Sequence, residues 1–150
     1  MKAYLCCGNK TGVKAPDEWI GFDIRMPCDV LQDVRTLDPR RFRGSTVFAT
    51  PPCNGFTDLP WRPATGEGLD VLEACWAICQ EADEWLLENS RFARRYLGPA
   101  ACHRDGHYFW GTLPVPEFRH VKGRTSGQNP LRRAALPVII KEIASLKDVL

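Results

Sequence analysis

The sequence predicts an α/β fold with an open, mainly parallel sheet, and three observations lead to this prediction. Short apolar runs bounded by turn residues fill the first fifty positions, which is typical of strands. The hydrophobic spacing then changes to that of a helix between Val71 and Ala82, and a buried strand, Trp85–Leu87, follows. Strands followed by a strand–helix–strand unit favour a sheet that binds ligands at the carboxyl ends of its strands.

Each expected element rests on a local pattern. Four apolar runs predict the first strands, Ala3–Cys7, Trp19–Ile24, Val30–Val34 and Thr46–Ala49. The helix presents one apolar face, made by Val71, Leu72, Cys75, Ile78, Cys79 and Ala82. The aromatic run His107–Trp110 is a further candidate strand. Leu136–Ile143 predicts a final helix with Pro137 in its first turn, after a proline- and glycine-rich loop over 113–130.

Composition limits the class of protein. The 150 residues, 44% hydrophobic and 25% charged, predict one domain spanning 1–150. No apolar run reaches the roughly 18–20 residues that cross a bilayer, and Met1 opens no signal peptide, so we expect no membrane partner. The seven cysteines are an odd number for a disulfide framework and lack zinc-site spacing. We therefore expect reduced thiols, a cytoplasmic location and no metal.

Cys53 and Glu88 are the first candidates for chemistry. The double proline of Thr50-Pro51-Pro52-Cys53 stiffens the end of a predicted strand, so that the cysteine is presented at the sheet edge. The alternative for a single cysteine is a small core residue. Glu88 follows a buried strand and is expected at the same edge, unless it is an exposed acid at a helix N-terminus. A thiolate that adds to an electron-poor ring needs a partner that donates a proton or hydrogen bond.

The earlier strands end in residues that suit a nucleoside. Leu5-Cys6-Cys7-Gly8 closes a strand in a glycine turn, where a backbone can approach a ligand closely. Asp23 ends the second strand and is positioned to accept hydrogen bonds from a ribose. Asp33 lies on the third candidate strand. Because acids end strands in many proteins, these signals carry weight only in combination.

Together and in this order, the motifs resemble those of the DNA (cytosine-5)-methyltransferase family, in a small, phage-like form. The matching segments are Leu5-Cys6-Cys7-Gly8, Phe22-Asp23-Ile24, Gln32-Asp33-Val34-Arg35, Thr50-Pro51-Pro52-Cys53, Leu87-Glu88-Asn89-Ser90 and Arg132 to Ala144. The resemblance covers nearly the whole chain. It implies a reduced, single-domain, Rossmann-like sheet of the S-adenosylmethionine-dependent methyltransferases.

The resemblance also implies roles for individual residues. Cys53 would add to carbon 6 of a cytosine flipped out of DNA, and Glu88 would hold or protonate ring nitrogen 3 before carbon 5 takes a methyl group from S-adenosylmethionine. Arg104 loosely matches the family's Arg-x-Arg motif and is the third catalytic candidate. The cofactor-binding candidates are Cys6, Cys7, Gly8, Asp23, Ile24, Asp33, Val34 and Pro51. Among these, Asp23 would bind the ribose and Asp33 the adenine amino group.

A target-recognition domain has no counterpart here, and the loop 113–130 stands in its place. Six basic residues are the DNA-binding candidates: Arg91, Arg119, Lys122, Arg124, Arg132 and Arg133. Phosphate contacts position a duplex without reading its sequence, so a partner chain that supplies recognition is one expectation and a solvated surface loop is another.

Two alternative functions stay open. Cys6 stands where the family has an aromatic residue over the cofactor, and Lys10-Thr11 replace a glycine pair. These departures favour a non-catalytic methyltransferase-like module that binds DNA or protein. A related methyltransferase that acts on RNA or a free nucleotide is the remaining option.

Overall fold

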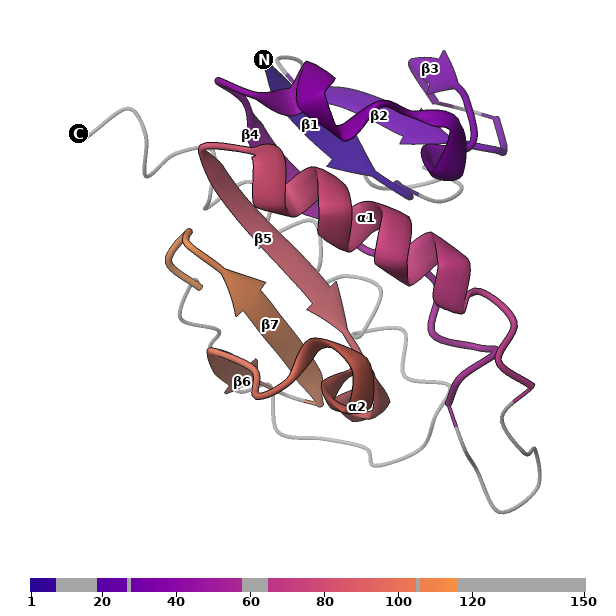
Figure 1. Ribbon diagram of the computed structural model, residues 1–150, viewed down its shortest axis with the longest axis vertical. Coiled ribbons are helices and arrows are strands. Elements are labelled where there is room, and N and C mark those ends of the chain that lie inside the picture. Colours follow the sequence, from indigo (N-terminus) through magenta and orange to yellow (C-terminus); the bar gives the residue numbers. More distant parts are fainter. Residues whose placement is uncertain (8–18, 27, 58–64, 105, 116–150) are drawn as a thin grey trace, which may run out of the picture.

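The architecture is that of a computed structural model, which describes residues 1–7, 19–26, 28–57, 65–104 and 106–115. Within these ranges the chain forms a seven-stranded sheet with one long helix lying across it (Figure 1). The strands are β1 (Lys2–Leu5), β2 (Trp19–Asp23), β3 (Val30–Leu31), β4 (Thr46–Ala49), β5 (Glu84–Asn89), β6 (Cys102–Arg104) and β7 (His107–Gly111). The helices are η1 (Val34–Thr36), η2 (Pro39–Phe42), α1 (Leu69–Glu81), η3 (Arg91–Ala93) and α2 (Arg94–Leu97).

The strand order confirms the predicted α/β class with a mostly parallel sheet. The order is β3-β2-β1-β4-β5-β7-β6; the first five strands run parallel, and β7 runs antiparallel to both of its neighbours. The order 3-2-1-4-5 is that of doubly wound nucleotide-binding sheets, so the fold is compatible with a Rossmann-like one. In such sheets ligands bind where the order reverses, which here lies between β1 and β4.

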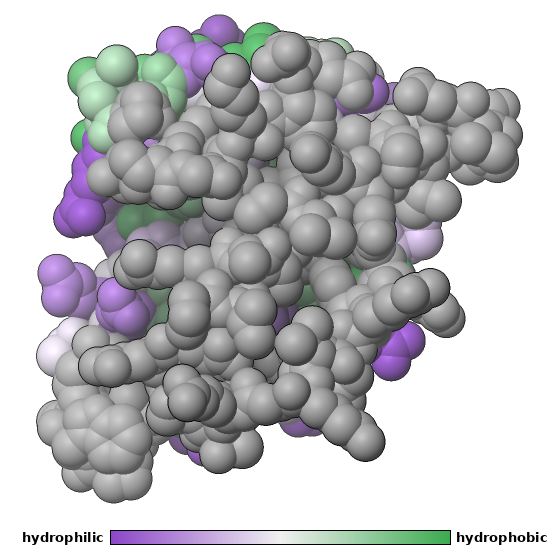
Figure 2. All heavy atoms as spheres, turned by 180° about the vertical axis from the view of Figure 1, so that it is seen from behind, coloured by the Kyte–Doolittle hydropathy of each residue, from purple (hydrophilic) through white to green (hydrophobic). Residues whose placement is uncertain are grey.

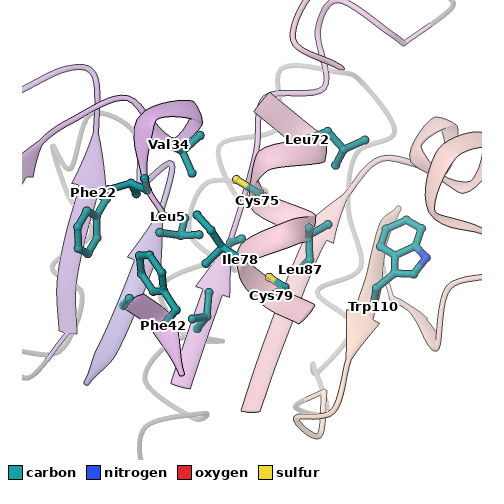
Figure 3. Packing of buried hydrophobic residues seen from close by; sticks show 14 of the residues in the cluster. Leu5, Phe22, Val34, Phe42, Leu72, Cys75, Ile78, Cys79, Leu87 and Trp110 are labelled. Atoms are coloured by element: carbon teal, nitrogen blue, oxygen red, sulfur yellow. The ribbon is translucent and has the colours of Figure 1, made fainter. Parts of the chain in front are cut away.

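Helix α1 covers one face of the sheet, as its apolar spacing predicts. It begins after Gly68, whose φ of 81° lies in the left-handed region that glycine adopts readily. Its buried side chains, Leu72, Cys75, Ile78 and Cys79, point toward Leu5 and Leu87 of the sheet (Figure 3). Burying an aliphatic side chain of this size contributes about 1.5–3 kcal/mol, so this face holds α1 on the strands.

The opposite face of the sheet carries a second buried cluster. It consists of Tyr4, Trp19, Phe48, Leu86, Phe109 and Leu113. Tyr4, Phe48 and Leu86 alternate along β1, β4 and β5 with residues of the cluster under α1, because successive side chains of a strand point to opposite faces. Seen from this side, hydrophobic side chains gather at the corner occupied by β3 (Figure 2), where Ile24, Met26 and Leu31 are 61%, 63% and 61% exposed.

The third strand is shorter than the sequence predicts. The run Val30–Val34 was expected to be extended, but β3 ends at Leu31 and Val34 begins η1. The reason is local: the Asp33 carboxylate accepts a hydrogen bond from the backbone N–H of Arg35 at 2.9 Å and caps a helical turn. Asp33 is therefore a cap residue and not a strand residue, which corrects its predicted position.

The fifth strand is longer than predicted and is followed by a hairpin. The sequence predicts a strand over Trp85–Leu87 with Glu88 just beyond it, whereas β5 continues to Asn89 because Glu88 and Asn89 pair with β7. The run His107–Trp110 does form a strand, and β6 was not foreseen. Gly111 ends β7 at φ 149°, where a Cβ atom would lie 2.2 Å from the Trp85 carbonyl oxygen, so only glycine fits.

Other expectations fall outside the described residues. These are the final helix Leu136–Ile143, the loop 113–130 beyond Val115, and the glycine turn at Gly8.

Candidate functional site

The ends of β1 and β4 are joined by Thr50, the residue that follows β4. Its backbone N–H donates to the Leu5 carbonyl at 3.1 Å, and its hydroxyl donates to the Cys6 carbonyl at 3.0 Å. The carboxyl edge of the sheet, meaning the side where β1, β4 and β5 end, is thus held together at the point where the strand order reverses. The predicted cofactor loop and the Pro-Pro-Cys loop start from adjacent strands.

The Pro-Pro-Cys loop is also joined to β5. The Asn89 side chain, only 2% exposed, donates from Nδ2 to the Pro51 carbonyl oxygen at 2.8 Å. Its own Oδ1 accepts from the Ser90 N–H at 2.8 Å. A buried side-chain amide whose nitrogen and oxygen both form hydrogen bonds holds the segments that it joins in fixed positions. The two motifs that the sequence predicts to act together are therefore physically connected.

Cys53 lies in a tight turn beyond Pro52. Its carbonyl accepts from the Thr57 N–H at 3.1 Å and from the Thr57 hydroxyl at 2.6 Å, and that hydroxyl lies 3.4 Å from Ser90 Oγ. The Cys53 side chain is partly buried and packs at the margin of the core cluster. The turn presents the thiol at the carboxyl edge while keeping part of its surface accessible.

Two cysteines of α1 are unsuited to act as nucleophiles. Cys75 and Cys79 are fully buried on α1. The Cys75 sulfur lies 3.7 Å from the Cys6 sulfur. This contact and the burial of Cys75 raise the pKa of its thiol well above the usual range. Burial alone raises the pKa of Cys79. Since only the thiolate is nucleophilic, these two residues have core roles.

Gly55 fixes the position of the Cys53 turn. Its carbonyl accepts from the N–H groups of Thr65 and Gly66 at 2.7 and 3.0 Å, which draws the segment before α1 onto the loop. A Cβ atom on Gly55 would lie 1.8 Å from the Glu67 carbonyl oxygen. That distance is far inside van der Waals contact, so any side chain here displaces one segment from the other.

Replacing Gly55 by alanine is therefore expected to lower the free energy of unfolding by about 3 kcal/mol or more, through overpacking and the loss of two backbone hydrogen bonds. Urea unfolding measures this directly. Gly44→Ala is the control, because Gly44 has φ +71° with nothing within 4 Å of a Cβ atom and costs only the left-handed conformation, about 1–2 kcal/mol. Equal losses in the two variants would contradict the close-approach argument.

Glu88 forms a short contact with His107 at the start of β7. Oε1 lies 2.5 Å from Nδ1, with the two side chains 13% and 18% exposed. The contact needs one proton between the two atoms, on either the imidazole or the carboxyl group. Glu88 makes no further hydrogen bond in the described part of the chain, so Oε2 is available to a ligand. His107 thus orients the carboxyl group.

Sequence reasoning missed His107 and named Arg104 as the third catalytic candidate, from a loose match to an Arg-x-Arg motif. Arg104 lies exposed at the end of β6, opposite His107 in the strand register, and has no hydrogen bond to Glu88 among the described residues. The antiparallel pairing of β5 with β7 brings His107 beside Glu88. In the sequence His107 is a histidine at the start of an aromatic strand, and nothing indicates a functional role for it until the strand pairing is known.

The cofactor candidates divide into two groups. Cys6, Asp23 and Ile24 lie at strand ends on the carboxyl edge, and Cys6 adopts φ 55°, an uncommon value for a non-glycine residue and one that often marks a functional turn. The Asp23 carboxylate accepts from the Arg25 N–H at 3.0 Å. Cys7 is partly buried beside the second cluster, and Pro51 is buried.

Asp33 and Val34 fit their predicted roles less well. The Arg35 guanidinium contacts both oxygens of Asp33, at 2.5–3.0 Å, and bridges to Asp70 at 2.6 Å. These side-chain hydrogen bonds hold the pKa of Asp33 below its usual range. Val34 is 6% exposed and belongs to the core cluster. The carboxylate that was expected to meet an adenine already has a strong partner.

Only one of the six predicted DNA-binding residues lies in the part of the chain that the structure describes. Arg91 is exposed in η3, two residues beyond Asn89, while Arg119, Lys122, Arg124, Arg132 and Arg133 lie outside the described residues. None of the helices in the described ranges has the length and hydropathy that crossing a bilayer requires. In the same part of the chain, no three His, Cys, Asp or Glu side chains come together as a metal site would need.

No protein-family profile matches the chain, and a comparison with curated proteins finds no match. The class therefore rests on the fold and the geometry. The chain is a mixed α/β protein with a mostly parallel sheet, compatible with a Rossmann-like fold. Its carboxyl edge brings together a loop cysteine and a carboxyl–imidazole pair.

Proposed function

We propose that this protein transfers a methyl group from S-adenosylmethionine to carbon 5 of cytosine in DNA, through a covalent adduct with Cys53. The observation that carries the proposal is the buried hydrogen bond from Asn89 Nδ2 to the Pro51 carbonyl oxygen. It ties the loop of the nucleophile to the strand of the acid, which a thiol-addition mechanism requires to act on one ring.

Cys53 starts the reaction. Its thiolate forms a bond to carbon 6 of the flipped-out base, and the electron pair of the 5,6 double bond moves toward carbon 5 and nitrogen 3. Carbon 5 then bonds to the methyl carbon as the sulfur–methyl bond breaks. The proton on carbon 5 leaves to solvent, the pair reforms the double bond, and the carbon–sulfur bond to Cys53 breaks.

Glu88 stabilises the adduct. Oε2 faces no partner among the described residues, so it can donate a proton or hydrogen bond to nitrogen 3 as charge builds there. His107 holds Oε1 and limits the rotation of the carboxyl group. A carboxyl group fixed before the base arrives loses less entropy on binding it.

The described residues fit the methyl donor in part. S-adenosylmethionine supplies an electrophilic methyl group when bound. Asp23 ends β2 beside the point of strand reversal, where a carboxylate can accept from ribose hydroxyls. Ile24, 61% exposed, offers an apolar surface to an adenine ring. Asp33 does not fit its expected contact with the adenine amino group, because Arg35 already occupies its carboxylate.

A methyl-transfer assay tests the proposal. Purified protein is incubated with methyl-labelled S-adenosylmethionine and a cytosine-rich duplex, and the nucleosides are separated after digestion. We expect label in 5-methylcytosine. Absence of label in DNA, or label in RNA alone, would overturn the assignment to DNA.

One observation favours a second candidate, a non-catalytic module of the same fold. The engagement of Asp33 by Arg35 removes one of the two acids expected to hold the nucleoside. Calorimetry with S-adenosylmethionine and S-adenosylhomocysteine separates the two candidates. Binding of either supports the enzyme. If neither binds at about millimolar concentration, the binding free energy is weaker than about 4 kcal/mol, and this result supports the module.

A further inference from the structure

A groove lined by three arginines lies directly beyond the end of β5. It has a volume of about 530 Å³ and is lined by Arg91, Phe92, Arg94, Arg95, Gly98 and Pro99. These residues belong to η3, α2 and the turn after them, near the β6–β7 hairpin (Figure 1). We call it the arginine groove.

The groove has a fixed framework. Trp110 Nε1 donates to the Gly98 carbonyl at 3.2 Å, which anchors the turn to β7, and the Ala93 N–H donates to the Ser90 carbonyl at 3.1 Å, which anchors η3 to β5. Since Ser90 adjoins Asn89, the groove is connected through a few covalent bonds to the strand that carries Glu88.

In the part of the chain that the structure describes, the three guanidinium groups lie against aromatic rings and not against acids. Arg91 and Arg95 lie 4.8 and 5.5 Å from the centre of the Phe92 ring, and Arg94 lies 6.0 Å from that of Tyr108. Among the described residues none of the three forms an ion pair.

Other arginines of this chain behave differently. Arg35 bridges Asp33 and Asp70, and Arg43 pairs with Glu81 at 2.6 Å. Three positive charges in one groove, without an acidic partner among the described residues, repel one another, and an anionic ligand relieves that repulsion. Aromatic stacking leaves the N–H edges of a guanidinium free to donate to phosphate oxygens.

We infer that the arginine groove binds the phosphate backbone of a DNA strand whose cytosine enters the site. The inference rests on the proposed function and names a contact surface for its substrate. Tyr96, 45% exposed, directly follows Arg95 on α2, and exposed aromatic residues among arginines in the sequence are typical of nucleic-acid grooves. Such contacts position the strand without reading its sequence.

The test is DNA binding as a function of salt. Fluorescence anisotropy of a labelled cytosine-containing duplex is measured in about 50 to about 200 mM KCl for wild type, Arg94→Gln/Arg95→Gln and Arg40→Gln/Arg41→Gln. The control pair is exposed in η2, which precedes β4 and so lies at the opposite edge of the sheet. All four side chains are exposed, and circular dichroism checks that each variant is folded.

We expect the Arg94/Arg95 variant to bind at least about tenfold more weakly and to lower the slope of log affinity against log salt by about 1.8, the value for two lost phosphate contacts. The control variant should match wild type. If both double variants bind DNA equally weakly, the loss of affinity reflects the lower net charge alone, and the inference is overturned. Competition by deoxycytidine monophosphate as strong as that by the duplex would show a site for single phosphates and overturn it as well.

The result is separable from the proposed function. A wild type that binds DNA through Arg94 and Arg95 but transfers no methyl group supports the groove and refutes the enzyme. If the protein transfers methyl groups but the salt dependence of DNA binding is unchanged in the Arg94/Arg95 variant, the groove is not the DNA-binding surface, and the proposed enzyme activity is retained.

Discussion

Cys53→Ser is expected to reduce methyl transfer by at least about 10⁴-fold, the scale on which enzymes lose activity when their nucleophile is removed. Serine is close to cysteine in size, and Cys53 is only partly buried, so the turn closed by Thr57 should persist. Its hydroxyl is a far weaker nucleophile than a thiolate near neutral pH. Labelled methyl transfer measures the loss.

A trapping experiment makes this prediction specific. In a duplex with 5-fluorocytosine, carbon 5 carries no proton to release, so the adduct should persist as a covalent protein–DNA band for wild type and be absent for Cys53→Ser. Cys102→Ser is the matched control, since Cys102 is a partly buried thiol on the edge strand β6. A covalent band in Cys53→Ser, or the loss of the band in Cys102→Ser, would show that Cys53 is not the nucleophile.

Glu88→Gln is expected to lower the rate by about 10³-fold, within the range that general acid catalysis contributes. Glutamine keeps the shape of the side chain and can still bond to His107, but it cannot protonate nitrogen 3. Release of tritium from carbon 5 of labelled cytosine reports adduct formation before methyl transfer, and it should fall in parallel.

The control for Glu88 lies on the same strand. Glu84→Gln changes the same group at the other end of β5, where Glu84 accepts from the Thr46 hydroxyl at 3.2 Å, and it should retain the wild-type rate. His107→Ala, which removes only the orienting contact, should lose less activity than Glu88→Gln. Activity in Glu88→Gln close to that of wild type would refute the acid role.

The two motifs of the site were predictable for different reasons. A double proline at a strand end is a backbone signal that depends on a few neighbouring residues, so Cys53 could be located without knowing the fold. The position of Glu88 at the carboxyl edge followed from the buried run Trp85–Leu87. That it lies inside β5 did not follow, because the last two residues of the strand are ordered by pairing with β7.

The two failures have different causes. Asp33 was assigned to a strand, but its side chain forms a local hydrogen bond as a helix cap, which competes with the extended conformation. The partnership of Glu88 with His107 spans 19 positions and depends on the antiparallel pairing of β5 with β7. Contacts between distant positions have no local pattern, so this second pairing could not be predicted from spacing.

The sequence by itself determined the α/β class, a helix with its apolar face between Val71 and Ala82 and a cysteine in the loop after β4, because hydrophobic periodicity and proline geometry act over short stretches. The tertiary structure decided which side chains meet. The Asn89–Pro51 hydrogen bond and the Glu88–His107 contact each join segments whose approach depends on sheet order and register. Register is set by the packing of the whole sheet, which no single segment encodes.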